Sequence, residues 1–231
     1  MAFELKSVVP WGRSLEEYGL MFNLTEADLG RRVVSFGDGP AGFNAQMHAL
    51  GHRVVSLDPI YGFTREELAG RIRETRDEVL AQVTRNRDNF VWTHIRDVAD
   101  LERIRMGAMD RFLADYDAGR REGRYVSHAL PDRTSYADDA FDLGLSSHFL
   151  VLYANLGLDF HLQSLGEMLR ICREVRIFPL LDLNANESAV LPGLTAHFGR
   201  DYALTVEPVA YEFQRNGNRM LRVVKREGTG G

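Results

Sequence analysis

The sequence has one cysteine, Cys172, so neither an intrachain disulfide nor a cysteine-based zinc site can form. A single thiol is typical of proteins from a reducing compartment. The sequence also lacks an apolar run long enough to span a membrane. Lys6, Pro10 and Arg13 interrupt the apolar stretch near the N-terminus, which therefore does not resemble a signal peptide. These absences predict a cytoplasmic protein without a membrane partner.

Lysine is almost missing, because Lys6 and Lys225 are the two lysines among 28 basic residues. The 33 acidic residues outnumber the basic ones and give a net charge of −5. No stretch carries the net positive charge that a phosphate backbone requires, so we expect no nucleic-acid partner. The 231 residues are 45% hydrophobic and 26% charged, which predicts an ordinary globular chain and a single domain.

Short apolar runs of the kind found in buried parallel strands alternate with stretches of helical spacing. The runs are residues 32–36, 53–57, 124–128, 141–146 and 175–181. Such alternation predicts right-handed crossovers and an open, mostly parallel α/β sheet with helices on both faces.

The C-terminal part departs from this alternation. Residues 202–213 and 218–225 are two strand-like runs, and Asn216-Gly217 lies in the short segment between them. Because Asn and Gly adopt positive φ at little cost, we predict a terminal antiparallel hairpin with a tight turn.

The second and third predicted strands are separated by far more residues than a simple crossover needs. Apolar residues at heptad-like spacing, beginning with Leu68 and Ile72, predict two or three amphipathic helices there. We therefore expect a single domain over residues 1–231 with a helical insertion at about 64–120. The insertion is either a structural embellishment or a cap over a substrate.

A glycine turn follows the first predicted strand. Gly37 allows the chain to reverse, Gly39 allows the backbone to approach a ligand, and a helix beginning near Gly42 offers free N–H groups. Asp58 stands at the end of the next strand, where a carboxylate can accept hydrogen bonds from both hydroxyls of a ribose. Together these features predict a ligand that contains adenosine, whereas the turn alone could serve only close packing of strand and helix.

Two cofactor classes fit this turn. Residues 37–42 read GDGPAG, which resembles the form common in FAD-binding folds, with Asp58 in the acid position. In those folds, however, the motif usually lies at the chain start, and no second glycine fingerprint follows here.

More of the chain resembles the class I S-adenosylmethionine-dependent methyltransferases. Their glycine motif follows strand one and their ribose acid ends strand two. Residues 136–148 resemble the segment around their strand four, and residues 165–170 resemble the helix after it. The likeness covers about residues 14–225, most closely to uncharacterised bacterial members, and implies a Rossmann-like fold with S-adenosylmethionine as cofactor.

The resemblance implies a set of cofactor-binding residues. These are Tyr18, Gly37, Asp38, Gly39, Asp58, Pro59, Leu130 and Ser146. The sequence departs from the family pattern at Ser35, where an acid usually orients the methionine amino group, and at Ala41, the usual third glycine. The segment 129–131 offers only backbone groups to an adenine. A non-catalytic binding or scaffold protein with this fold therefore remains an alternative.

Methyl transfer is an in-line displacement that depends mainly on alignment, with a general base useful for some acceptors. His148 follows the fourth strand and titrates near neutrality, so we expect it to be a base or a substrate contact. A histidine capping a helix is the equal alternative. His94, Asp182 and Asn184 are weaker candidates.

We predict no metal site, because Gly51 should end the helix between His48 and His52. Without a basic face, the predicted acceptor is a small molecule. The sequence carries no signal for an oligomeric state.

Overall fold

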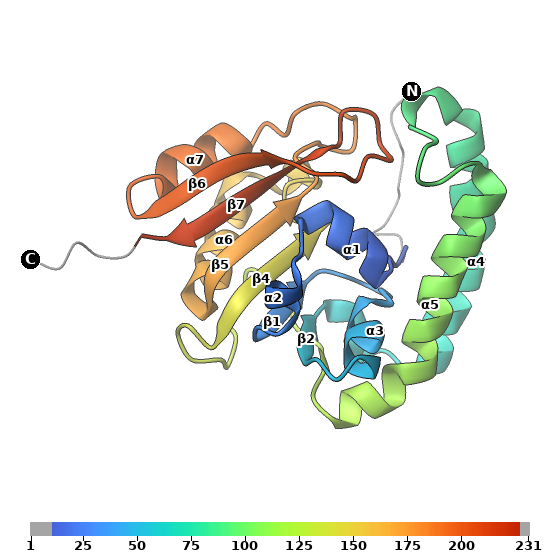
Figure 1. Ribbon diagram of the computed structural model, residues 1–231, viewed down its shortest axis with the longest axis horizontal. Coiled ribbons are helices and arrows are strands. Elements are labelled where there is room, and N and C mark those ends of the chain that lie inside the picture. The colour runs from blue at the N-terminus through green and yellow to red at the C-terminus, as the bar shows by residue number, and fades with distance from the viewer. Residues whose placement is uncertain (1–10, 227–231) are drawn as a thin grey trace, which may run out of the picture.

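The computed structural model describes residues 11–226, which form one mixed sheet of seven strands in the order β3-β2-β1-β4-β5-β7-β6 (Figure 1). The first five strands are parallel, and β7 is antiparallel to both β5 and β6. Their bounds are β1 (Val33–Phe36), β2 (Val54–Leu57), β3 (Tyr125–Val126), β4 (Phe141–Ser147), β5 (Cys172–Phe178), β6 (Tyr202–Pro208) and β7 (Arg219–Lys225).

Helices cover both faces of the sheet. The helices are α1 (Leu15–Phe22), α2 (Glu26–Leu29), α3 (Phe43–Ala49), α4 (Arg65–Arg85), α5 (Val98–Arg121), α6 (Leu158–Ile171) and α7 (Leu191–Phe198), with 3₁₀ turns η1 (Pro59–Gly62), η2 (Arg87–Asn89) and η3 (Ala154–Leu156). Within residues 11–226 no helix has both the length and the apolarity to cross a membrane.

Alternate residues of the central strands serve two separate cores, as expected for strands buried on both faces. Val34 and Phe36 of β1 pack with the side chains of α6 and α7, whereas Val33 packs with α1 and α3. All four residues of β1 are buried. The predicted α/β sheet, mostly parallel with a C-terminal antiparallel pair and helices on both faces, is confirmed.

The long segment between β2 and β3 forms two antiparallel helices at one side of the molecule (Figure 1). Helix α5 packs on α3 so closely that a Cβ at Gly42 would lie 2.8 Å from the Ala108 carbonyl oxygen. Its Phe112 and Tyr116 are fully buried. Helix α5 therefore belongs to the core, and α4 packs against α5.

The terminal hairpin has a longer connection than the sequence predicted. The ladder of β6 with β7 extends from Tyr202 paired with Lys225 to Pro208 paired with Arg219. Residues 209–218 then leave the sheet, because Tyr211 is drawn into the core beneath α1 and the Phe213 carbonyl accepts a hydrogen bond from the backbone of Val91. The prediction of strand over residues 209–213 was wrong. The predicted turn is present, because Asn216 has φ of 66° and the Gly217 N–H donates to the Gln214 carbonyl at 2.8 Å.

Candidate functional site

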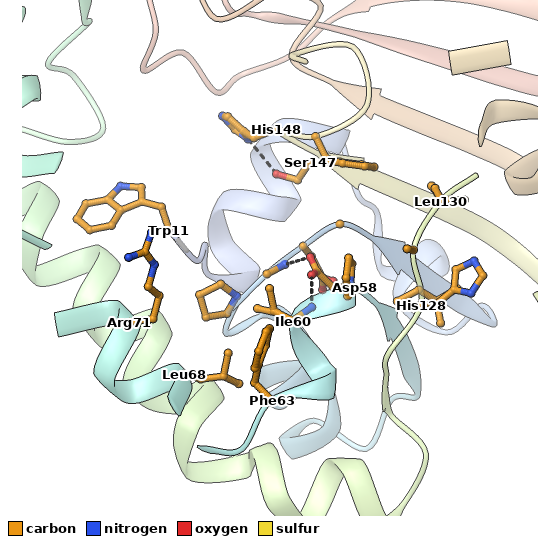
Figure 2. A pocket seen from close by; sticks show the side chains of 18 of the residues that line it. Trp11, Asp58, Ile60, Phe63, Leu68, Arg71, His128, Leu130, Ser147 and His148 are labelled. Carbon is orange, nitrogen blue, oxygen red and sulfur yellow. Dashed lines mark hydrogen bonds between the residues drawn. The ribbon is translucent and has the colours of Figure 1, made fainter. Parts of the chain in front are cut away.

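A cavity of about 780 Å³ lies at the carboxyl ends of β1, β2 and β4, and we call it the main cavity. The glycine turn, the loop after β2, the segment after β3 and the end of β4 line it, together with one side of α4 (Figure 2). Open parallel sheets bind ligands at this edge, where the strand order reverses direction. The volume is within the range of small-molecule sites.

The turn after β1 requires glycine at two positions. Gly37 has φ of +64°, and a Cβ there would lie 2.6 Å from the ring of Phe149. Gly39 has φ of +56°, but a Cβ there would meet open space. Left-handed backbone favours glycine at both, and the open space at Gly39 leaves room for a ligand to approach the backbone.

Asp58 connects this turn to the end of β2. One carboxylate oxygen accepts a hydrogen bond from the Gly39 N–H at 2.9 Å, and the other accepts one from the Ile60 N–H at 2.9 Å (Figure 2). The side chain thus caps η1 and also holds the glycine turn. Each carboxylate oxygen keeps a further lone pair for a ligand in the main cavity. Burial raises the pKa of Asp58.

Asp38 is a second buried acid beside Asp58. It accepts hydrogen bonds from the hydroxyl of Ser56 at 2.8 Å and from that of Tyr61 at 3.0 Å. Burial, and next the neighbouring Asp58 carboxyl, raise the pKa of Asp38 to about 7. Asp38 therefore changes protonation near neutral pH, which an exposed aspartate does not do.

The side chain of Tyr18, in α1, lines the main cavity. Its ring stacks on Phe43 with centroids 4.1 Å apart, and its hydroxyl lies 3.4 Å from the hydroxyl of Ser35. Burial raises the pKa of Tyr18 well above its ordinary value, so the phenol stays protonated. Where the resembled family carries an acid, this chain places a pair of hydroxyl groups.

His148 stands at the end of β4 in left-handed backbone, with φ of 54°. Its backbone N–H donates to the Phe178 carbonyl at 2.6 Å. Its ring Nδ1 lies 2.9 Å from the Ser147 hydroxyl (Figure 2). Burial, then the charges of Arg13 and Arg105, lower the pKa of His148 well below its ordinary value. The imidazole is therefore neutral at neutral pH and is a weaker base than an exposed histidine.

The hydroxyl of Ser147 has two neighbours. It donates to Met21 Sδ at 3.8 Å. It is also hydrogen-bonded to His148 Nδ1, and the direction of that bond depends on the tautomer of the imidazole.

Of the predicted site residues, Tyr18, Gly37, Asp38, Gly39, Asp58, Pro59, Leu130 and His148 all line the main cavity. Ser146 does not. Successive strand residues point to opposite faces, so the side chain of Ser146 is fully buried on the other side of β4, with no hydrogen-bond partner among the described residues. The neighbouring Ser147 lines the main cavity instead.

The weaker candidates lie elsewhere. His94 contacts the Ala210 carbonyl at 3.0 Å, and Asp182 accepts from the backbone of Asn184 and Asn186 within a turn. Asn184 lines a smaller, neighbouring cavity. Across residues 11–226, no three or more His, Cys, Asp or Glu side chains group as metal ligands would.

Sequence reasoning did not find the residues that reach the main cavity from outside the sheet. They are Arg13 ahead of α1, Phe63, Glu67, Leu68, Gly70, Arg71 and Glu74 from the start of the α4 segment, and Tyr153 and Phe160 after β4. The helical spacing of Leu68 was visible, but which side of α4 would face the cavity depends on its packing on α5.

Comparisons with known proteins give a relative in sequence and a group of solved structures with a similar fold. No protein-family model matches the chain. It is 32% identical over 219 residues to the uncharacterized protein MJ0045 of Methanocaldococcus jannaschii, across 94% of this chain and 96% of that protein. Similar solved structures include the N-methyltransferase NodS from Bradyrhizobium japonicum WM9 in complex with S-adenosyl-L-homocysteine (TM-score 0.48, 11% identity, 92% of this chain and 85% of that chain). Another is the magnesium protoporphyrin IX methyltransferase from Synechocystis PCC 6803 with bound SAM (TM-score 0.45, 12% identity, 87% of this chain and 73% of that chain).

Proposed function

This chain belongs to the same family as the Methanocaldococcus jannaschii protein MJ0045, and we propose that it transfers a methyl group from S-adenosylmethionine to a small-molecule acceptor. The observation that carries the proposal is the joint placement of a glycine turn and Asp58 at the ends of adjacent parallel strands, around one cavity. A glycine turn, a helix start and an acid in this arrangement suit an adenosine with a charged or polar extension.

The residues present fit such a cofactor. The open space at Gly39 and the further lone pairs of Asp58 suit a ribose, and Pro59, Ile60 and Leu130 offer apolar surface to an adenine. Gly37 and the neighbouring hydroxyl groups of Tyr18 and Ser35 would hold the amino-acid end of the cofactor. The ionised carboxylates of Asp38 and Asp58 can only accept hydrogen bonds. When Asp38 is protonated, its carboxyl group can also donate one.

S-adenosylmethionine, when bound, supplies a methyl group on a positively charged sulfur. The work of the chain is to orient the acceptor and exclude water. We assign the imidazole of His148 to a hydrogen bond that orients the acceptor, because the ring is neutral and lines the main cavity. Side chains of α4, such as Leu68, wall the cavity on the side away from the sheet and limit the entry of water (Figure 2).

Ser35 supports one alternative, a non-catalytic protein that kept the fold. A hydroxyl there replaces the negative charge that faces the methionine amino group in the resembled family. Binding of S-adenosylhomocysteine without methylation of any acceptor in a small-molecule library would support that alternative. Flavin absorbance of the purified protein after reconstitution would instead indicate an FAD-binding protein.

Asp58→Ala should weaken binding of S-adenosylhomocysteine by about ten- to a hundredfold, because charge-assisted bonds to two ribose hydroxyls are lost. The variant should also lose about 1–2 kcal/mol of stability, since Gly39 and Ile60 lose their acceptor. Asp58→Asn, which keeps one acceptor oxygen, should lose less affinity. Isothermal titration calorimetry and urea unfolding of the same samples measure both quantities.

Asp132→Ala is the matched control, since Asp132 is an exposed carboxylate on the loop after β3 and does not line the main cavity. It should keep both affinity and stability. An Asp58→Ala variant that loses stability but binds S-adenosylhomocysteine within threefold of the wild type would limit Asp58 to capping η1 and refute its ribose role.

A further inference from the structure

A second, smaller cavity of about 200 Å³ adjoins the main cavity, and we call it the side cavity. Four residues line both cavities: Trp11, Arg13, His148 and Tyr153. None of the residues of the glycine turn and none at the end of β2 lines the side cavity. A ligand in the side cavity would therefore contact His148 without occupying the adenosine site.

The wall of the side cavity is largely apolar. Val79 and Val83 of α4 line it, as do the rings of Phe90 and Phe213, which stack with centroids 4.7 Å apart. Trp11 adds a third aromatic side chain at the junction with the main cavity. Such a wall suits a flat, apolar group rather than a sugar or a peptide backbone.

Arg13 is the charged exception at this junction. Its Nη1 donates to the Trp11 carbonyl at 2.9 Å, but its Nε is buried and has no hydrogen-bond partner among residues 11–226. No carboxylate of these residues forms an ion pair with Arg13. A guanidinium has five N–H donors. The Nε–H is shielded and one Nη1 donor is used, so the remaining donors of the two terminal nitrogens are left for a ligand.

The acid that acts electrostatically on Arg13 is Glu17, which is already paired with another arginine. Glu17 accepts hydrogen bonds from Arg105 and, at 3.0 Å, from the hydroxyl of Tyr211. It also caps α1 through Ser14. Two guanidinium groups thus face one carboxylate in a buried cluster, and burial and Arg105 lower the pKa of Arg13 to about 10. At neutral pH Arg13 is still charged, and its charge is uncompensated.

We propose that Arg13 binds the acidic group, a carboxylate or a phosphate, of a methyl acceptor whose flat apolar part occupies the side cavity. Arg13 is half-buried and forms no ion pair of its own among the described residues, and an anionic ligand would pair with the planar fork of its guanidinium. The acceptor atom then lies beside His148, which lines both cavities. This inference rests on the proposed methyltransferase function and names the class of its acceptor.

The test compares two probes of equal shape, 2-naphthoate and its neutral amide 2-naphthamide, on the protein saturated with S-adenosylhomocysteine. We expect 2-naphthoate to bind at least tenfold more tightly than 2-naphthamide by calorimetry. In Arg13→Met this preference should disappear through weaker binding of the anion, with binding of the amide within threefold of the wild type. Arg13→Lys, which keeps the charge but not the planar fork, should retain part of the preference.

Arg121→Met is the control, because Arg121 is exposed near the end of α5 and lines neither cavity. It should bind both probes as the wild type does. Equal binding of the two probes to the wild type, no binding of either at millimolar concentration, or an unchanged preference in Arg13→Met would each overturn the inference. The first two results require no variant, so they hold even if a variant fails to fold.

A second comparison separates the acceptor from the amino-acid end of the cofactor, which also carries a carboxylate. S-adenosylhomocysteine has that end and 5′-methylthioadenosine lacks it. We expect Arg13→Met to bind both as the wild type does. A selective loss of S-adenosylhomocysteine would assign Arg13 to the cofactor and overturn the acceptor assignment. Absence of S-adenosylhomocysteine binding to the wild type would instead contradict the proposed function itself.

Discussion

Glu17→Gln should lower the free energy of unfolding by about 3–5 kcal/mol, the usual cost of removing one partner from a buried ion pair. Arg105 is 1% exposed, and Glu17 is the carboxylate that pairs with it. Glutamine keeps the size of the side chain and an acceptor oxygen for the α1 cap, so the loss reports the charge rather than the shape. The variant leaves Arg13 and Arg105 uncompensated within one cluster.

Urea unfolding followed by circular dichroism measures this loss. Glu16→Gln is the matched control, because Glu16 is the neighbouring exposed acid in the first turn of α1, and its effect should stay within about 0.5 kcal/mol. The double variant Glu17→Gln/Arg105→Met should be more stable than Glu17→Gln alone, since it removes the unpaired charge. A single variant as stable as the wild type would show that the cluster contributes no net stabilisation.

Asp38→Asn should remove a pH dependence of stability that the wild type shows between about pH 4 and pH 7. The pKa of Asp38 is about 7 in the folded protein and 3.8 in its ordinary state. In this range the folded protein therefore binds more protons than the unfolded chain, and stability falls as pH rises. About three pKa units correspond to a contribution of about 4 kcal/mol, lost by pH 8.

Urea unfolding at pH 5 and pH 8 gives the comparison. The advantage of Asp38→Asn over the wild type should be larger at pH 8 by about 2–3 kcal/mol, since about two pKa units lie between pH 5 and the folded pKa. Asp58 lies beside Asp38 and its raised pKa acts in the same direction, but it is present in both proteins and largely cancels. A difference between the two proteins that is the same at both pH values would mean that Asp38 is ionised throughout the range.

The parts of the fold that local sequence determines were predictable. The predicted strands at residues 32–36 and 53–57 end at a glycine turn and at Asp58, and the structure has β1 and β2 there with both features at one sheet edge. Ser14 caps α1 with Glu17 three residues later, as a capping box requires. These signals lie within a few residues of the feature that they predict.

The parts that depend on distant contacts were not predictable. Glu17 and Arg105 are 88 positions apart, so no local sequence feature near either residue predicts their ion pair. Which of Ser146 and Ser147 faces the cavity depends on strand register, and one position changes the face. Tyr211 leaves the hairpin because its hydroxyl bonds to Glu17, a contact that no turn motif encodes. The uncompensated charge of Arg13 follows only from all of these placements together.

Titration of the wild-type protein with S-adenosylhomocysteine in a calorimeter tests the central claim most directly. The proposed cofactor site predicts saturable heat for one site per chain, a rise in melting temperature, and a weaker response in Asp58→Ala than in Asp132→Ala. Absence of both heat and thermal shift at millimolar ligand would contradict the assignment of the main cavity to S-adenosylmethionine, and with it the proposed methyl transfer.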